Sequence, residues 1–197
     1  MPKYLSKSSY MAGLECPKRL WQILWDRNSA APMGGMGELL TKIGTQFGEL
    51  AHGLFPGATL INIDIFNLDA AVEDTRLAID YGASVILEAA FQHGQCRILA
   101  DVVERQADGS WHLIEVKSSS SVKDDHIIDL AYQKWVMMQA GYPVSRCSVI
   151  HANKEAVWPN VLEIFTQVDV SDEVDNQYGQ VETSLAPMLP LLQVGAE

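Results

Sequence analysis

Two apolar segments that each contain charged residues at set places constrain this chain more than any other feature of its sequence. Residues 95–106 and 110–118 read QCRILADVVERQ and SWHLIEVKS, and only the residues ADG separate them. Both segments have the composition of β-strands, and a short connection that contains glycine is typical of a β-hairpin. An acid inside an apolar strand costs free energy unless it has a partner, so Asp101 and Glu115 need a structural or chemical reason to be there.

The connection also predicts how the two strands pair. In a three-residue hairpin loop with Gly109 in the left-handed conformation, residue 106 pairs with residue 110, and counting outward pairs Asp101 with Glu115. Cross-strand partners have Cβ atoms about 4.5–5.5 Å apart, and Glu115 and Lys117 share one face of their strand. We therefore expect two carboxylates and one ammonium group to meet on one patch of the sheet.

The strand before this hairpin adds a third acid. Residues 84–92 read as a strand that returns through a two-residue turn at 93–94, which pairs residue 92 with 95 and residue 88 with 99. Residue 99 shares a face with Asp101, so we expect Glu88 on the same side of the sheet, diagonal to Asp101.

Clustered carboxylates repel one another unless a proton or a cation lies between them. Hard oxygen ligands favour Mg²⁺ or Mn²⁺, and such an ion polarises a phosphoryl oxygen and activates water near neutral pH. The charge of Lys117 could hold the attacking water or offset charge in the transition state. The competing interpretation is that Asp101 and Glu115 are ordinary strand charges, with Lys117 as their salt-bridge partner.

The rest of the chain predicts helices around this meander. We expect helices over 8–14, from 16 onward and over 38–54, 69–81 and 125–140, further strands over 59–63, 146–152 and 161–168, and a loop over 28–37. This order predicts an α/β (α+β) fold, with a central mixed β-sheet flanked by helices and an N-terminal helical segment. The expected domain spans 1–168, with its helical part at 1–37 and its core at 38–168. An acidic extension or linker is expected over 169–197.

The ordered motifs resemble the PD-(D/E)XK nuclease superfamily. Its pattern is an acidic residue and then Glu-x-Lys on a hairpin, followed by a helix that bears Gln. The matching stretches here are LSKSSYMAGLECPKRLW, FPG, ILADVVER, IEVKSS and DLAYQ. The resemblance covers residues 4–168. More narrowly, the chain resembles the RecB-like branch, which includes the iron–sulfur exonucleases of CRISPR systems. It resembles still more closely the N-terminal nuclease-like part of a family of larger bacterial proteins of uncharacterised function. The resemblance implies a restriction-endonuclease-like core.

The resemblance also implies roles for individual residues. Asp101 and Glu115 would be metal ligands, the carbonyl of Val116 would complete the metal shell, and Lys117 would be the catalytic lysine. Gln133 would join this catalytic set from a helix beside the hairpin. The alternative for Gln133 is that it only caps or orients the strand.

Two positions depart from the RecB-like pattern. That branch carries a histidine in its early helix, where this chain has Gly48. Glu49 would supply an oxygen ligand to the metal instead, and His52 is a weaker substitute one turn later; the alternative is that both are solvated. The branch also places a tyrosine four residues after the glutamine, where this chain has Met137.

Cys16 resembles the first ligand of the iron–sulfur nucleases. The chain has only three cysteines, which are too few for four-thiolate ligation. We therefore predict an iron–sulfur cluster only if further cysteines lie downstream of this sequence; otherwise Cys16 is a remnant. Three widely spaced cysteines also predict no disulfide framework and a reducing compartment, which is the cytoplasm.

The net charge of −11 argues against tight, nonspecific DNA binding. Residues 1–27 nevertheless carry five basic residues and two acids, and Lys18 and Arg19 are candidate DNA contacts. No apolar run approaches the roughly 18 to 20 residues that span a bilayer, so we expect no membrane association. No feature of the sequence decides the oligomeric state.

Together these features predict a Mg²⁺- or Mn²⁺-dependent deoxyribonuclease, exonuclease-like, that acts on single-stranded DNA or DNA ends. The alternative is a catalytically inactive nuclease-fold module that binds nucleic acid or a protein partner.

Overall fold

A six-stranded mixed sheet lies at the centre of the computed structural model, which describes residues 3–26, 35–64, 66–156 and 161–193. The strands follow one another across the sheet in chain order: β1 Thr59–Leu60, β2 Val85–His93, β3 Cys96–Arg105, β4 Trp111–Lys117, β5 Val144–Ala152 and β6 Phe165–Asp169. The pairs β1–β2 and β4–β5 are parallel, and the other three pairs are antiparallel.

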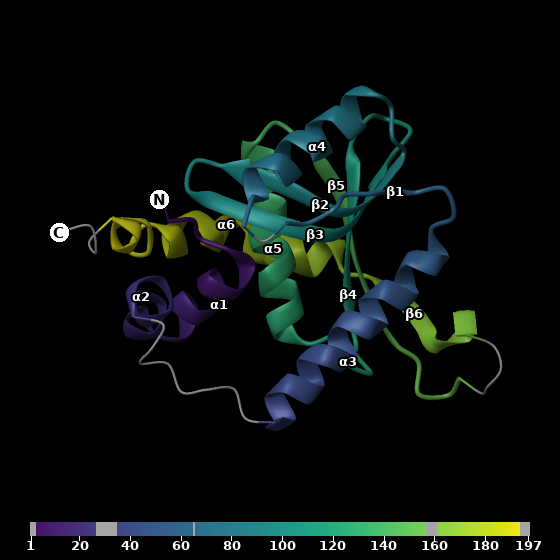
Figure 1. Cartoon of the computed structure of the whole chain (residues 1–197), viewed down its shortest axis with the longest axis horizontal. Helices are drawn as coiled ribbons and strands as arrows, with labels where there is room; N and C mark the ends of the chain where they lie inside the picture. The colour runs from purple at the N-terminus through teal and green to yellow at the C-terminus, as the bar shows by residue number, and fades with distance from the viewer. Residues whose placement is uncertain (1–2, 27–34, 65, 157–160, 194–197) are drawn as a thin grey trace.

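Helices surround this sheet, as Figure 1 shows. They are α1 Lys7–Glu15, α2 Pro17–Trp25, α3 Gly35–Ala51, α4 Leu68–Asp80, α5 Asp124–Gln139 and α6 Ser171–Leu185, with short 3-10 helices η2 His52–Leu54, η3 Val161–Ile164 and η4 Leu189–Leu192. Helix α4 packs against β2, α5 packs against β2 to β5, and α3 packs against β4. No helix in the described part of the chain is long and apolar enough to cross a membrane.

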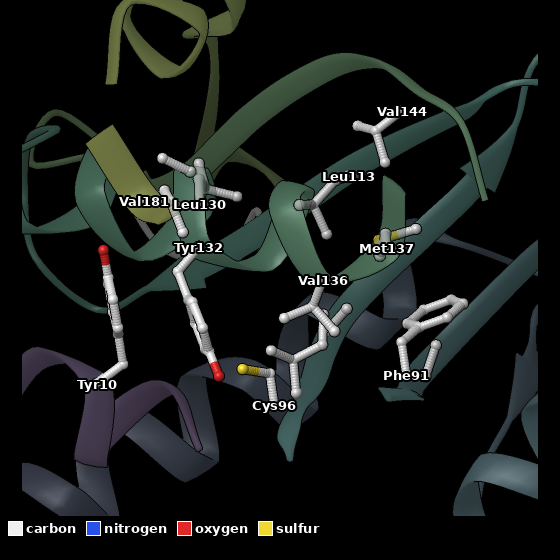
Figure 2. Close-up of a cluster of buried hydrophobic side chains, with 14 of the residues drawn as sticks. Tyr10, Phe91, Cys96, Leu113, Leu130, Tyr132, Val136, Met137, Val144 and Val181 are labelled. Carbon is white, nitrogen blue, oxygen red and sulfur yellow. The ribbon is translucent and has the colours of Figure 1, made fainter. Parts of the chain in front are cut away.

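The hairpin strands bury both of their faces. Successive strand residues point to opposite sides, so Leu113 joins the large core that includes Leu130 and Val136 of α5, whereas Ile114 joins a smaller cluster with Val102. Figure 2 shows part of the large core, where Leu113 of β4 faces the α5 side chains. Burial on both faces explains why these strands are apolar on both sides of their charged residues.

The start of α1 is held tightly against the sheet and α5. The Leu5 carbonyl accepts hydrogen bonds from the Arg97 backbone N–H at 3.0 Å and from the Tyr132 hydroxyl at 2.6 Å. Tyr10 stacks on Tyr132 with 4.2 Å between ring centroids (Figure 2). Ser6 caps α1, so the helix begins at Lys7, one residue earlier than the sequence predicts. Packing therefore fixes the backbone beside residue 7.

The second hairpin has the predicted register. Val102 pairs with Ile114, the Gln106 N–H donates to the Ser110 carbonyl at 2.8 Å, and Gly109 has a φ of +86°. Continuing this pairing outward sets Asp101 opposite Glu115.

The predicted register of the first hairpin is wrong. The turn lies at 94–95 rather than 93–94, and His93 pairs with Cys96. Gly94 has a φ of +54°, which suits the first central position of a tight hairpin turn. The pairing shifts by two residues, so each strand residue keeps the face that the sequence predicts. Glu88, however, comes to lie level with Asp101 instead of diagonal to it.

Other boundaries also differ from expectation. Strand β1 ends at Leu60 instead of residue 63, and the strand expected from 161 begins at Phe165 after η3. Of the loop expected over 28–37, residues 28–34 lie outside the described residues and Gly35 already begins α3.

The expectation of an acidic extension or linker over 169–197 also needs correction. Residues 171–185 form α6, which packs on α5, and Val174, Val181 and Leu185 are buried in the large core. The exposed acids of α6 mask this apolar face in the composition, because a helix needs only one apolar stripe to pack.

The packing of α6 can be tested by truncating one buried side chain. Leu185 is 2% exposed, so Leu185→Ala should lower the free energy of unfolding by about 2–5 kcal/mol, measured by chemical denaturation. Glu182→Ala, at an exposed position of the same helix, should change it by less than about 0.5 kcal/mol. Equal small effects would show that α6 does not contribute to the core.

Candidate active site

The adjacent strands β3 and β4 bring two carboxylates together. The Val116 N–H donates to Asp101 Oδ2 at 2.7 Å, which fixes the Asp101 side chain against β4. The Asp101 side chain is 27% exposed and the Glu115 side chain only 3%. One carboxylate of the pair therefore faces solvent in part, and the other is buried.

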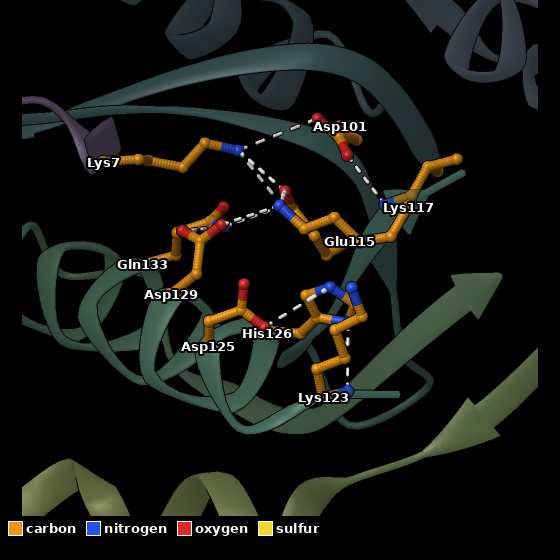
Figure 3. A network of polar contacts seen from close by, with 10 residues as sticks. Lys7, Asp101, Glu115, Lys117, Lys123, Asp125, His126, Asp129 and Gln133 are labelled. Atoms are coloured by element: carbon orange, nitrogen blue, oxygen red, sulfur yellow. Dashed lines mark hydrogen bonds and ion pairs between the residues drawn. The ribbon is translucent and has the colours of Figure 1, made fainter. Parts of the chain in front are cut away.

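Helix α5 completes the polar cluster from one face of the sheet (Figure 3). Lys117 Nζ lies 2.7 Å from Glu115 Oε1 and 2.9 Å from Asp129 Oδ2. Gln133 Nε2 donates to Glu115 Oε2 at 2.7 Å and to Asp129 Oδ1 at 3.1 Å. Asp129 and Gln133 are one helical turn apart, so a single face of α5 presents both to the hairpin. The structure thus brings together Asp101, Glu115, Lys117 and Gln133, the four residues predicted as the catalytic set.

A fifth charged group, Lys7 of α1, also reaches this cluster, and sequence reasoning missed it. Lys7 Nζ donates to both oxygens of Glu115 at 3.1 Å and lies 3.8 Å from Asp101 Oδ1. Figure 3 shows its side chain entering between these two carboxylates. The only signal in the sequence is indirect: two acids that share a buried patch need more positive charge than Lys117 alone supplies.

Burial and neighbouring charge shift the pKa values of the cluster. Burial raises the pKa of Asp101 well above its usual range, and the charge of Glu115 raises it further. Burial also acts to raise the pKa of Glu115, but the ammonium groups of Lys7 and Lys117 outweigh it and hold that pKa below its usual range. The carboxylates in turn raise the pKa of both lysines against the effect of burial. The negative charge of Asp101 would therefore be stabilised by an added cation.

Besides the cavity beside Glu115, a second cavity of about 680 Å³ is lined by Asp101. Its lining includes the other predicted oxygen donors: Glu49, Glu88, Asp101 and Val116, together with His52. The first cavity, of about 580 Å³, is lined by Glu115, Lys117, Asp129 and Lys7. Glu115 and Lys117 thus line one cavity, and Asp101, Glu88 and Glu49 line the other. Lys7 of the first cavity lies 3.8 Å from Asp101 of the second.

Glu88 has an unusual backbone in this second cavity. Its φ is +56°, and it lies unpaired between the pairs formed by Leu87 and Ala89 with β3. His52 Nε2 lies 3.4 Å from its carboxylate. Residues other than glycine rarely adopt a positive φ, and such strain clusters at functional sites. The residue with this strained backbone lines the cavity that Asp101 also lines.

The remaining predicted residues lie away from this cluster. Cys16 is an exposed free thiol, and Cys96 and Cys147 are buried free thiols. Lys18 and Arg19 are exposed on α2, where Arg19 pairs with Glu15. Neither of these basic residues is among those that line the two cavities.

The donor set fits a divalent cation with few protein ligands. Among the described residues, no three side chains of His, Cys, Asp or Glu converge closely enough to hold a metal unaided. Mg²⁺ commonly uses only one or two carboxylates and takes water and substrate phosphate for the rest. Asp101 and Glu115 meet that need, and the Lys7 ammonium against both of them shows that this point attracts positive charge.

No protein family and no curated protein matches this sequence. Among solved structures, LHK-Exo in complex with dAMP aligns over 98% of this chain and 88% of its own, with 14% identity and a TM-score of 0.50. The alkaline exonuclease LHK-Exo from Laribacter hongkongensis aligns over 97% and 88%, with 14% identity and a TM-score of 0.39. SSO0001 aligns over 90% and 84%, with 13% identity and a TM-score of 0.30. The first likeness shows the fold and confirms the expected α+β class; the other two scores are too low to carry an argument.

The strain at Glu88 can be measured by comparing two variants at that position. Glu88→Gly and Glu88→Ala both remove the carboxylate, but only glycine adopts a positive φ without cost. We expect Glu88→Gly to be more stable than Glu88→Ala by about 1–2 kcal/mol in chemical denaturation.

Gln167, exposed on β6, is the matched control. There the order should reverse, with glycine about 0.5–1 kcal/mol less stable than alanine. The same order at both positions would mean that the backbone at residue 88 is not strained.

Proposed function

We propose that this chain is a metal-dependent nuclease that hydrolyses phosphodiester bonds of DNA. The observation that carries the proposal is the convergence of Asp101, Glu115 and Lys117 on one patch. Two carboxylates with an ammonium group beside them suit phosphodiester hydrolysis, in which negative charge builds up on the phosphate and a water must be activated.

Asp101, Glu115 and the carbonyl of Val116 would hold one Mg²⁺ or Mn²⁺. When bound, the ion would polarise a phosphoryl oxygen and make an attacking water more acidic. We propose Glu88 and Glu49 as additional oxygen donors from the second cavity, since both line it together with Asp101.

Lys117 would act on the substrate directly. It lines the cavity of about 580 Å³ beside Glu115, so a phosphate that enters there would meet its ammonium group. A fixed positive charge at that point would orient the attacking water or offset charge in the transition state. Asp129 accepts from Lys117 at 2.9 Å and would keep the ammonium group in place.

Gln133 would position Glu115. Its amide nitrogen donates to the carboxylates of Glu115 and Asp129, whereas its Oε1 is the one buried side-chain oxygen or nitrogen without a hydrogen-bond partner among the described residues. An unsatisfied buried polar atom costs about 1–3 kcal/mol. A residue kept at that cost suits a role in the site better than a role in stability.

The substrate and the narrower relationships belong to the same proposal. The LHK-Exo structure contains dAMP, a deoxynucleotide, and together with the shared fold this favours DNA, with exonuclease-like action on single strands or ends. Lys18 and Arg19 remain candidate DNA contacts outside the site. Membership of the RecB-like branch and a cytoplasmic location also remain proposals, and an iron–sulfur cluster at Cys16 would need cysteines beyond this sequence.

Removing the Lys117 ammonium tests catalysis. With Mn²⁺ present, Lys117→Ala should cut labelled single- and double-stranded DNA at least about a hundredfold more slowly than the wild type, the loss typical of a group that stabilises transition-state charge. Lys154→Ala, at an exposed position, should retain full activity. A wild type without activity, or equal rates for wild type and Lys117→Ala, would refute the proposed enzyme.

A second candidate function is a catalytically inactive module that binds nucleic acid or a protein partner. The observation in its favour is that Lys7 already forms ion pairs with both acids assigned to the metal.

Calorimetric titration with Mn²⁺ separates the two functions. The enzyme should bind Mn²⁺, and Asp101→Asn should weaken binding at least about tenfold, because it removes one charged ligand. Asp108→Asn, in the exposed hairpin loop, is the control and should bind as the wild type does. Wild-type protein that binds DNA but gives no heat with Mn²⁺ would support the inactive module.

A further inference from the structure

Lys7 is the one charged group of the cluster that the proposed chemistry does not use. Its side chain is 22% exposed and makes its ion pairs with residues of β3 and β4, 108 positions away along the chain in the case of Glu115. The backbone beside it is held by the Leu5 hydrogen bonds and the Ser6 cap. Only the flexible side chain of Lys7 can therefore move without disturbing the fold around it.

Lys7 and Lys117 divide the carboxylates between them. Lys117 bridges Glu115 and Asp129, whereas Lys7 bridges Glu115 and Asp101. Asp101 and Glu115 are the pair that we assign to the metal. Lys7 therefore occupies the carboxylate oxygens that a divalent cation would need.

The two cations exclude each other for two reasons. The first is space: both oxygens of Glu115 accept from Lys7 Nζ at 3.1 Å, and a Mg²⁺ bound to the same oxygens at about 2.0–2.1 Å would lie in the path of that ammonium group. The second is charge, because an ammonium group and a divalent ion a few ångströms apart repel strongly in a poorly solvated cluster.

The structure also offers Lys7 a place to go. Lys7 lines the cavity of about 580 Å³, together with Ser6, Ser8 and Tyr4. The four-carbon stem of a lysine can swing its ammonium group into such a space without backbone movement. Leaving the carboxylates therefore requires only rotation about side-chain bonds.

We propose that Lys7 is a built-in counter-cation, which holds the Asp101–Glu115 pair in the metal-free protein and which a divalent cation displaces when it binds. The inference rests on the proposed metal site. It adds that metal binding is a cation exchange and that α1 supplies the cation that leaves. Lys7 is thus a positioning residue that keeps the two carboxylates together before metal arrives, at the expense of metal affinity.

Calorimetric titration with Mn²⁺ alone tests the exchange. Lys7→Met keeps the approximate length of the side chain and removes its charge. This variant should bind Mn²⁺ at least about tenfold more tightly than the wild type, because one unit of positive charge beside the metal is gone. Lys154→Met, at an exposed position, should bind as the wild type does.

The possible outcomes separate this inference from the proposed function. Equal or weaker Mn²⁺ binding by Lys7→Met, with measurable binding by the wild type, would overturn the exchange and leave the metal site standing. No Mn²⁺ binding by any variant would overturn both.

A second measurement uses the wild type, in case Lys7→Met folds poorly. Labelling with an amine-specific reagent, followed by peptide mass spectrometry, reports how accessible each lysine is. Saturating Mn²⁺ should increase labelling of Lys7 severalfold and leave labelling of the exposed Lys154 unchanged. Labelling of Lys7 that stays constant while calorimetry shows Mn²⁺ bound would overturn the exchange.

Discussion

The rest of the structure depends on the buried carboxylate of Glu115. Its side chain is 3% exposed, and three donors from three elements reach it: Lys7 of α1, Lys117 of β4 and Gln133 of α5. A buried ion costs several kcal/mol unless it is paired and hydrogen-bonded. The buried carboxylate is therefore tolerated only because the fold brings α1 and α5 to the same end of β4.

Apolar packing brings the helices close enough for these polar contacts to form. The stacked rings of Tyr10 and Tyr132 and the hydrogen bond from Tyr132 to the Leu5 carbonyl hold the start of α1 against α5. The site nevertheless contains features that lower stability, such as the unpaired Oε1 of Gln133 and the positive φ of Glu88. Natural proteins keep such costs mainly where function requires them, which is why we interpret the cluster as a working site and not as a salt bridge that stabilises the sheet.

Local signals predicted most of the fold, and the errors have physical reasons. Gly109 set the register of the second hairpin, because its positive φ fixes the loop length and the alternation of faces follows from it. In the first hairpin Gly94 could begin or end the turn, and the wrong choice shifted the register. Helix α6 was missed because its exposed acids dominate the composition, whereas a few apolar residues such as Val174 decide its packing.

For the site, the sequence by itself determined that Asp101, Glu115 and Lys117 would meet. Turn geometry and side-chain alternation act between near neighbours in the chain, so both can be counted from the sequence. Only the tertiary structure decided that Lys7 would enter between the two acids and that Asp101 and Glu115 would line different cavities. The physical reason is that contacts between distant segments depend on how helices pack on the sheet. No local pattern encodes a contact between residues 7 and 115, and it exists only once Leu5, Tyr10 and α5 are in place.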